Sequence, residues 1–225
     1  MIMLKRVKAV LFDLNGTLAY VDNPISHIEL SDLLLGKGYE VSPQQLSAAW
    51  FFVSIIDYPR YGYRSWRSFL LRVFKRLRVG VDKETLDCIV KLLESRPYRL
   101  YPDAASAVAK VRRSGFKTAL VTTIARFQFE EAISPIKKFL DLIMTGYEAR
   151  CDKTNPRMYK RTLKILGVKA EEAVMVGDDV FLDVVLPKRL GMRAILLDRH
   201  GRGLSCDQAD AVVSTLGQAL RCIMP

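Results

Sequence analysis

The sequence is poor in the residues from which disulfide frameworks and zinc sites are built. Its four cysteines, at positions 88, 151, 206 and 222, are widely separated and form no Cys-x-x-Cys pair. This spacing excludes a recognisable zinc motif and a dense disulfide framework. The two histidines, His27 and His200, show no spacing that would pair them. A chain of 225 residues can bury a sizeable core without such cross-links.

Long apolar runs are also missing. No uncharged apolar stretch is long enough to cross a bilayer. The N-terminal residues Met-Ile-Met-Leu-Lys-Arg lack the apolar run that follows the basic start of a signal peptide. We therefore expect a cytoplasmic protein with no membrane partner.

Acidic residues are fewer than basic ones. The chain has 35 Lys and Arg against 24 Asp and Glu, a net charge of +11. Such an excess suits an anionic partner, which could be a phosphorylated small molecule, a nucleic acid or an anionic lipid. It is equally compatible with a basic surface that only keeps the protein in solution.

Short apolar runs alternate with helical patterns from residue 100 onward. Alternation of this length predicts a parallel sheet covered by helices on both faces. The expected fold class is α/β, with a Rossmann-like, doubly wound parallel sheet. The predicted strands, including one near the N-terminus, are residues 7–12, 117–121, 140–144, 173–176, 193–197 and 211–213.

The segment between the first strand and residue 100 has a different character. It shows helical spacing of apolar residues and few strand signals, with Ser42 and Pro43 forming a typical helix start. We expect an α-helical cap domain at residues 21–99, inserted into a core formed by residues 1–20 and 100–225. The predicted helices of the insert are residues 25–35, 43–56, 65–77 and 82–93.

Polar side chains follow three of the predicted strands. Because the ends of parallel strands meet at one edge of a sheet, we expect these side chains and a lysine near them to converge. A carboxylate, a hydroxyl, a lysine and an acidic pair suit phosphoryl transfer, with a hard cation held by oxygen ligands. The residues concerned are Asp13, Thr122, Lys153, Asp178 and Asp179.

Four motifs resemble those of the haloacid dehalogenase superfamily. The sequence Phe-Asp-Leu-Asn-Gly-Thr-Leu at 12–18 resembles the first motif, usually Asp-x-Asp-Gly-Thr in phosphatases. Thr122 resembles the second, the segment 153–159 the third, and Val-Gly-Asp-Asp at 176–179 with Asp183 the fourth. Each motif alone has an ordinary explanation as a turn, a helix cap or a surface charge, but the ordered set covers essentially the whole chain.

The resemblance implies a set of roles at the acidic residues. Asp13 is expected to be the nucleophile and a ligand of Mg²⁺, the implied cofactor. Asn15 would give its backbone carbonyl to the metal. Asp178 would be a direct metal ligand, and Asp179 a direct or water-mediated one. The insert resembles the helical cap of the family's first structural subclass.

The remaining roles concern the substrate, expected to be a small phosphorylated or otherwise anionic molecule. Thr122 and Lys153 would bind the transferring phosphoryl group, and Thr123 would contact the substrate. Asp183 would orient Lys153 or a metal-bound water. Thr17 would support the residues that bind the metal and substrate without being a ligand itself. The sequence leaves open whether the protein is a monomer or a homodimer.

One position departs from the phosphatase pattern. Asn15 stands where these enzymes carry a second aspartate that protonates the leaving group and later activates water. An amide can do neither, and such acid–base help is typically worth roughly a hundred- to ten-thousand-fold in rate. The catalytic residues implied by the resemblance are therefore Asp13, Asn15, Thr122 and Lys153, with weakened acid–base chemistry at Asn15.

Four interpretations follow from Asn15. The protein could be a slow phosphatase for good leaving groups, such as acyl or aryl phosphates. It could be a non-catalytic protein that binds a phosphate ligand, or an enzyme whose Asn15-Gly16 bond deamidates to give aspartate. It could instead resemble a 2-haloacid dehalogenase. Against this, those enzymes carry an aromatic residue at the Asn15 position and an arginine soon afterwards, and no arginine occurs between Asp13 and Arg60.

The insert carries a strongly basic segment. Residues 60–78 hold seven Lys and Arg and no acidic residue, with aromatic residues interleaved in the first half. If the insert closes over the site, as caps of the resembled family do, we expect this segment to contact an anionic or aromatic leaving group of the substrate, with Arg60 and Arg64 as the contacting residues. The alternatives are a solvated helix face and a surface for single-stranded nucleic acid.

Overall fold

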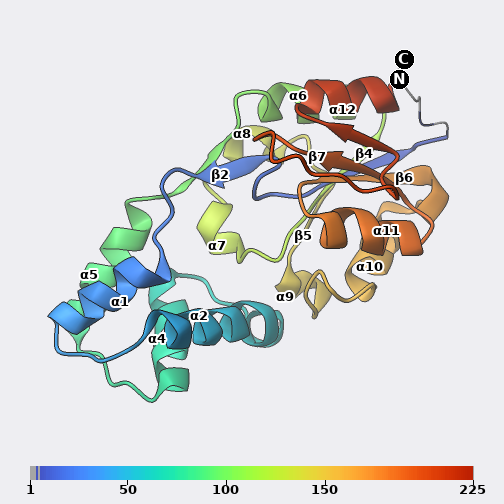
Figure 1. The fold of residues 1–225 in the computed structure, drawn as a ribbon. Helices are drawn as coiled ribbons and strands as arrows, with labels where there is room; N and C mark the ends of the chain where they lie inside the picture. Colours follow the sequence, from blue (N-terminus) through green and yellow to red (C-terminus); the bar gives the residue numbers. More distant parts are fainter. Residues whose placement is uncertain (1–3, 5, 225) are drawn as a thin grey trace.

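The computed structural model describes residue 4 and residues 6–224 of the chain, and its centre is a parallel sheet. Six strands pair in the order β5-β4-β1-β6-β7-β8, and every neighbouring pair is parallel (Figure 1). The chain therefore builds outward from β1 in one direction and then in the other, as the sequence predicted. The strands are β1 (Ala9–Phe12), β4 (Lys117–Val121), β5 (Leu142–Met144), β6 (Ala173–Gly177), β7 (Arg193–Leu197) and β8 (Ala211–Val213).

Helices cover both faces of the sheet because the central strands are apolar throughout. Alternate residues of β1 point to opposite faces, so Val10 and Phe12 join one core cluster while Ala9 and Leu11 join another. The first cluster lies under α6 (Ala104–Arg113) and α12 (Leu216–Ile223), and the second lies against α10 (Arg157–Leu166). In Figure 1, α6 and α12 lie above the sheet and α10 lies below it. This confirms the predicted Rossmann-like α/β class.

The segment after β1 is helical, as its apolar spacing predicted. Ser26, Ser42, Ser65 and Asp82 each cap a helix start, because the side-chain oxygen accepts a hydrogen bond from a backbone N–H in the first turn. The second helix continues through a π-helical turn into a further short helix. The helical elements are α1 (His27–Gly36), α2 (Pro43–Phe52), η1 (Val53–Asp57), α3 (Tyr58–Tyr61), α4 (Trp66–Leu77) and α5 (Lys83–Glu94).

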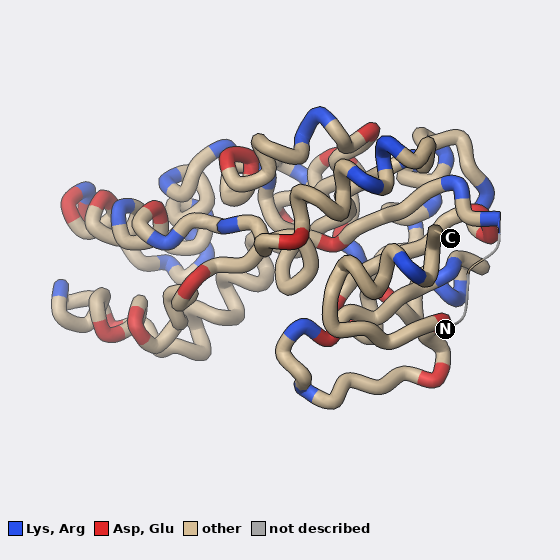
Figure 2. Tube along the Cα trace, turned by 90° about the horizontal axis from the view of Figure 1, so that it is seen from above, with Lys and Arg blue, Asp and Glu red and all other residues tan. Residues whose placement is uncertain are grey.

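A two-stranded antiparallel ribbon joins this helical insert to the rest of the chain. It consists of β2 (Ala19–Val21) and β3 (Tyr98–Leu100), and the sequence patterns did not predict it. Both chain crossings between the two lobes therefore lie side by side. Figure 2 shows the insert and the sheet region as two lobes seen from above.

A second contact ties the insert to the edge of the sheet. The hydroxyl of Tyr58 lies 3.0 Å from Thr145 Oγ1 and accepts a hydrogen bond of 3.1 Å from the backbone N–H of Arg126. Tyr58 is buried and belongs to α3, which packs against α9 (Gly146–Ala149). The insert is thus held over the ends of β4 and β5.

Several short elements differ from the sequence prediction. The helix expected after Thr123 is broken into α7 (Arg126–Phe129) and α8 (Ser134–Lys137), and the one expected after Asp179 is a π-helical turn, η3 (Val180–Val185), followed by α11 (Leu186–Arg189). Single turns of helix are too short to show a 3.6-residue period, so the sequence did not indicate where these helices break. Among the described residues, no helix combines the length and apolarity needed to span a membrane.

Two adjacent leucines of α4 test how the insert is stabilised. Leu70 is 1% exposed and Leu71 is 52% exposed. We expect Leu70→Ala to lower the free energy of unfolding by about 2–5 kcal/mol, because it leaves a cavity in the insert core. The matched Leu71→Ala change should stay within about 0.5 kcal/mol. Guanidinium unfolding followed by circular dichroism measures both, and equal losses would contradict the assignment of Leu70 to the core.

Candidate functional site

The structure brings three polar residues together at one edge of the sheet. Asp13 follows β1, Thr122 follows β4 and Asp178 follows β6, which are neighbouring strands. Sheet hydrogen bonding continues past the strand ends, since Asp13 N donates to Val176 O at 2.9 Å and Thr122 N donates to Met144 O at 3.0 Å. The backbone of the sheet thus fixes where these side chains begin.

Lys153 links the site to a second acidic residue. Its side chain is 2% exposed, and its Nζ is paired with Asp13 Oδ1 and lies 2.6 Å from Asp183 Oδ1. Burial lowers the pKa of Lys153, but attraction to these two carboxylates outweighs burial and raises the pKa above its ordinary value. The lysine is therefore charged at neutral pH and compensates two buried carboxylates.

Asp13 is the carboxylate most strongly affected by its surroundings. Burial raises the pKa of Asp13 to about 7, and the neighbouring Asp183 and Asp178 act in the same direction. Lys153 opposes this shift through charge and through a hydrogen bond. A further positive charge at the site would favour the ionised form that a nucleophile requires.

Two glycines let the polypeptide approach these carboxylates closely. Gly16 has a φ of +76°, and a Cβ there would lie 2.3 Å from Asp178 Oδ2. A Cβ on Gly177 would lie 2.2 Å from Asp183 Oδ2. The turn that carries Asn15 therefore stands directly against Asp178, and no larger residue fits at either position without movement.

Three carboxylates are close enough to hold one cation. Ligand oxygens of Asp13, Asp178 and Asp183 all lie within 4.8 Å of one another. Carboxylate oxygens are the ligands that Mg²⁺ prefers, so the donors fit the metal expected from the sequence. Asp179 is outside this group, because it is exposed and its Oδ1 caps η3 by accepting a 2.7 Å hydrogen bond from Leu182 N. Asn15 is exposed beside the group.

The threonines expected at the site differ in their surroundings. Thr122 is buried, and its Oγ1 accepts a hydrogen bond of 3.1 Å from Ile124 N, which shapes the turn after β4. Thr123 is half-buried. Thr17 is fully buried, and its Oγ1 has no hydrogen-bond partner among the described residues.

Two arginines that the sequence analysis missed also reach the site. Arg202 Nη2 donates to Asp178 Oδ2 at 3.2 Å. Arg199 donates to the carbonyl of Thr17 at 2.8 Å and forms an ion pair with Asp103 at 2.8 Å. Both lie on the loop after β7, which ends at the same edge of the sheet as β1 and β6. Both arginines follow the strand predicted at 193–197, and this position could have indicated that they lie near the site.

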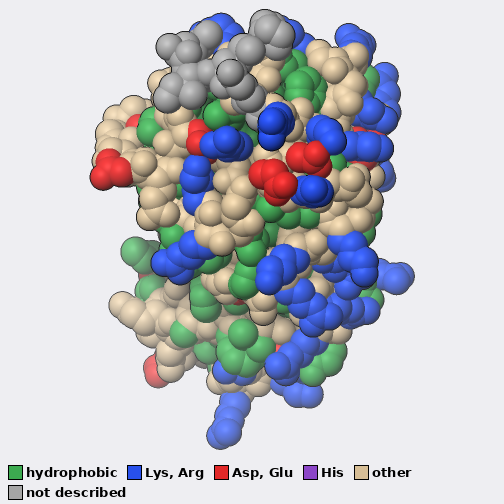
Figure 3. Space-filling view, turned by 90° about the vertical axis from the view of Figure 1, so that its right-hand side faces the viewer, with side chains coloured by type: hydrophobic (Ala, Val, Ile, Leu, Met, Phe, Trp, Pro, Cys, Tyr) green, Lys and Arg blue, Asp and Glu red, His purple; other side chains and the backbone are tan. Residues whose placement is uncertain are grey.

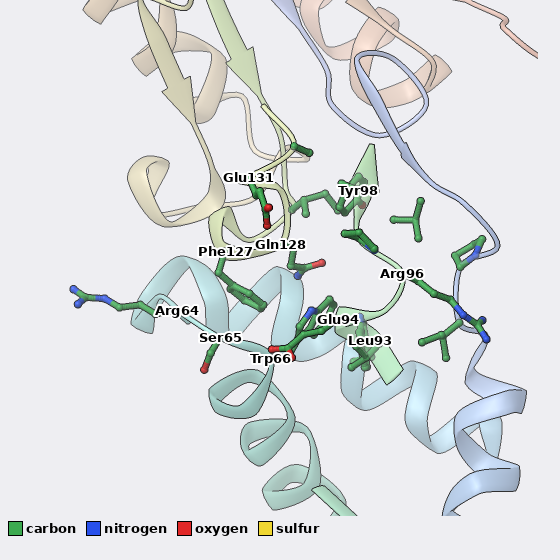
Figure 4. Close-up of a pocket in the computed structure, with 17 residues that line it drawn as sticks. Arg64, Ser65, Trp66, Leu93, Glu94, Arg96, Tyr98, Phe127, Gln128 and Glu131 are labelled. Atoms are coloured by element: carbon green, nitrogen blue, oxygen red, sulfur yellow. The ribbon is translucent and has the colours of Figure 1, made fainter. Parts of the chain in front are cut away.

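The two arginines expected to bind substrate lie at different hollows. Arg60 borders a hollow of about 590 Å³ on the insert, with Tyr61, Arg72 and other basic residues. Arg64 lines a cavity of about 770 Å³ between the insert and the core (Figure 4). The structure does not bring Arg60 and Arg64 together in one pocket.

Basic side chains also gather away from the carboxylate cluster. Figure 3 shows many more Lys and Arg than Asp and Glu side chains on the face it presents. The exposed side of α10 contributes to the positive surface, because its charged residues are Arg157, Lys160, Arg161 and Lys164. The excess positive charge therefore lies partly on the surface away from the site.

Comparison with known proteins points to one family of hydrolases. A family model for haloacid dehalogenase-like hydrolases matches residues 7–191. A phosphoserine phosphatase of Thermus thermophilus is 35% identical over 108 residues, which cover 47% of this chain and 43% of that protein. A glyceraldehyde 3-phosphate phosphatase of Methanopyrus kandleri is 29% identical over 203 residues, covering 86% of this chain and 84% of that protein.

Solved structures share the fold. A haloacid dehalogenase-type phosphatase of Thermococcus onnurineus aligns with a TM-score of 0.66 and 26% identity, covering 96% of this chain and 97% of that one. A 2-haloacid dehalogenase of Pseudomonas syringae aligns with a TM-score of 0.69 at 19% identity over 96% and 97% of the two chains. The second similarity concerns the fold alone, since phosphatases and dehalogenases both have it.

Removing Lys153 tests the electrostatic description of the site. Lys153→Met leaves two buried carboxylates without a counter-ion, and we expect it to lower the free energy of unfolding by about 3–5 kcal/mol. Lys160→Met, on the exposed side of α10, is the matched control and should change stability by less than about 0.5 kcal/mol.

The loss should also depend on pH. Without Lys153 the pKa of Asp13 rises further in the folded state, because the charge and hydrogen bond that lower it are gone, while in the unfolded chain it stays at about 4. The folded variant then binds more protons than the unfolded chain, so its stability falls as pH rises. Unfolding curves recorded in EDTA should show a larger deficit at pH 8 than at pH 5, and a deficit that shrinks as pH rises would refute the description.

Proposed function

Because the chain belongs to the haloacid dehalogenase-like hydrolase family, we propose that it is a magnesium-dependent phosphatase that acts through Asp13. The observation that carries this proposal is the position of Asp13. It is buried at the end of the central strand, paired with Lys153 and within 4.8 Å of two further carboxylates. A nucleophilic carboxylate flanked by a lysine and a cation site is suited to phosphoryl transfer.

The first step uses Asp13 as the nucleophile. An oxygen of its carboxylate attacks phosphorus, a new P–O bond forms, and the bond from phosphorus to the leaving group breaks with its electron pair going to the leaving group. Lys153 and Thr122 are placed to hold phosphate oxygens, with Thr123 beside them. Bound Mg²⁺ would supply positive charge against the phosphate.

The metal would be held by the carboxylates already gathered at the edge of the sheet. We assign Asp13 and Asp178 as ligands, with the backbone carbonyl of Asn15 as a third. Asp183 would hold Lys153 and the metal surroundings in place, since it accepts a hydrogen bond from Asp179 N at 3.1 Å. Asp179 would reach the metal only through water.

The second step releases phosphate. Water attacks phosphorus, the bond between phosphorus and Asp13 breaks, and the carboxylate is regenerated. Neither this water nor the first leaving group can exchange a proton with the Asn15 amide, which is expected to cost roughly a hundred- to ten-thousand-fold in rate. Substrates whose leaving groups are stable as anions, such as aryl and acyl phosphates, should therefore react best.

The insert is proposed to act as a cap over this site. We assign residues 21–99 to the cap and residues 1–20 and 100–225 to the core. The contact of Tyr58 with Thr145 and Arg126 supports this role, because it holds the insert above the strand ends. The named activities of the relatives favour a small phosphorylated substrate.

A second candidate function is binding of nucleic acid, favoured by the hollow on the insert. Arg60, Arg72, Lys75 and Arg76 surround it together with two aromatic residues. The guanidinium of Arg72 lies 4.9 Å from the centre of the Tyr61 ring. Affinity for a single-stranded oligonucleotide that falls steeply with salt and with charge reversal at Arg76 would support this candidate.

An assay of three proteins tests the phosphatase proposal. Wild type, Asp13→Asn and Asn15→Asp are compared on phenyl phosphate, acetyl phosphate and an alkyl phosphate, with magnesium and with EDTA. We expect wild type to need metal and to favour phenyl and acetyl phosphate, and Asp13→Asn to be inactive. Asn15→Asp should raise the rate on the alkyl ester by roughly a hundred-fold or more, because it restores a proton donor.

Asn23→Asp is the control for the added charge, since Asn23 is exposed in the linker after β2. It should leave every rate unchanged. Mass spectrometry of the wild-type preparation shows whether Asn15 has deamidated, which would itself explain activity on alkyl esters. If neither wild type nor Asn15→Asp releases phosphate from any ester, the phosphatase proposal fails.

A further inference from the structure

The cavity that Arg64 lines lies between the insert and the core. Its volume is about 770 Å³, and it does not include Asp13, Lys153 or Asp178. Its lining comes from helices α2, α4 and α5 of the insert, from the linkers that join insert and core, and from α7 and its surroundings in the core. A ligand there would touch both lobes at once.

Aromatic rings dominate one wall of this cavity. The ring centres of Trp50 and Trp66 are 5.7 Å apart, and those of Trp66 and Phe127 are 5.3 Å apart at an angle of 88°. All three side chains are only half-buried, so part of each ring is accessible. Figure 4 shows Phe127 of the core and Trp66 of the insert on one side of the cavity and Tyr98 on the other. Such rings favour edge-to-face or offset contact with a further ring.

The charged groups of the cavity lie mainly at its rim. Arg96 is engaged by Glu29 through two hydrogen bonds of 2.7 and 3.0 Å, so it is not free to bind an anion. Arg64, Glu94 and Glu131 also line the cavity, and all three are exposed. The interior is completed by aliphatic side chains, including those of Val21, Ile25 and Ile124. This lining suits an apolar ring better than a sugar or another polyol, whose hydroxyls would need hydrogen-bond partners.

The cavity reaches the reacting groups at two points. Ile124 lines it and donates its backbone N–H to Thr122 Oγ1 at 3.1 Å. Tyr98 lines it as well, and both burial and the nearby carboxylate of Asp13 raise the pKa of Tyr98. These two contacts place the cavity next to residues proposed to hold the phosphate, so the ester group of a phosphate at Asp13 could extend into it.

Asn15 and the cavity favour the same chemistry. A phenol has a pKa of about 10, as the tyrosine side chain does. Phenolate can therefore leave without being protonated, and the proton that Asn15 cannot supply is not needed. When Asp13 forms its bond to phosphorus, the electron pair of the broken P–O bond passes to the phenolate oxygen, which later takes its proton from water. An alkoxide leaving group has a far higher proton affinity and gains nothing from the rings.

We propose that this cavity holds the aromatic leaving group of aryl phosphate monoesters and makes them the preferred substrates. The inference rests on the proposed phosphatase function. It assigns substrate binding to Trp50, Trp66 and Phe127, which lie outside the four catalytic motifs. It also distinguishes aryl from acyl phosphates, which Asn15 alone does not.

The chain supplies its own reporter for the test. It contains two tryptophans, and both line the cavity. We expect phenylphosphonate, which cannot be hydrolysed as an ester, to change tryptophan fluorescence in the presence of magnesium. Methylphosphonate should change it little. Phe127→Ala, which keeps both tryptophans, should weaken phenylphosphonate binding about ten-fold and lower kcat/KM for phenyl phosphate similarly, with acetyl phosphate unaffected.

Two further variants keep the test decisive. Ala132→Phe reduces the cavity volume without removing a ring and should give the same selective loss. Phe51→Ala removes a ring that is 66% exposed and outside the cavity, and should change nothing. If Phe127→Ala and Ala132→Phe leave phenylphosphonate binding and the preference for phenyl phosphate intact, the inference is wrong. Asp13-dependent hydrolysis of acetyl phosphate in the same proteins would show that the phosphatase function stands independently.

Discussion

The candidate site depends on one buried positive charge, the side chain of Lys153. Lys153 lies between Asp13 and Asp183, and without it two carboxylates would be buried uncompensated at the end of the sheet. The same lysine fixes where the nucleophile points and how strongly it resists protonation. Gly16 and Gly177 then allow the turn after β1 and the end of β6 to close around this group. Packing, charge balance and the proposed chemistry therefore share one constraint.

The sequence predicted the sheet and the long helices because their patterns extend over enough residues to be read. The strands at 117–121, 193–197 and 211–213 have the predicted bounds, and α4 and α5 match the helices predicted at 65–77 and 82–93 to within one residue. The convergence of Asp13, Thr122 and Asp178 followed from parallel strands alone. The metal and catalytic roles of these residues remain predictions.

Other features could not be predicted from the sequence because they depend on which segments meet in space. The ribbon of β2 and β3 pairs residues 77 to 81 positions apart, and neither strand is long enough to show a period of two. Asp183 rather than Asp179 joins the carboxylate cluster because η3 uses Asp179 as its cap. Trp66 belongs to the basic and aromatic segment at 60–78 that the sequence singled out, but Arg202, Trp50 and Phe127 were not predicted, because isolated residues on separate elements form no motif.

The paired linkers have a consequence for how such a protein diversifies. Since Val21 and Tyr98 face each other across the ribbon, the two ends of the insert are neighbours in space. The sheet order and the carboxylate cluster are set by segments outside those ends. The helical insert could therefore be lengthened or replaced by another insert, with the same short ribbon joining it to the core. Tyr98 belongs to that ribbon and also lines the cavity proposed to hold the leaving group, so an exchange of the insert at this point is expected to change substrate preference as well.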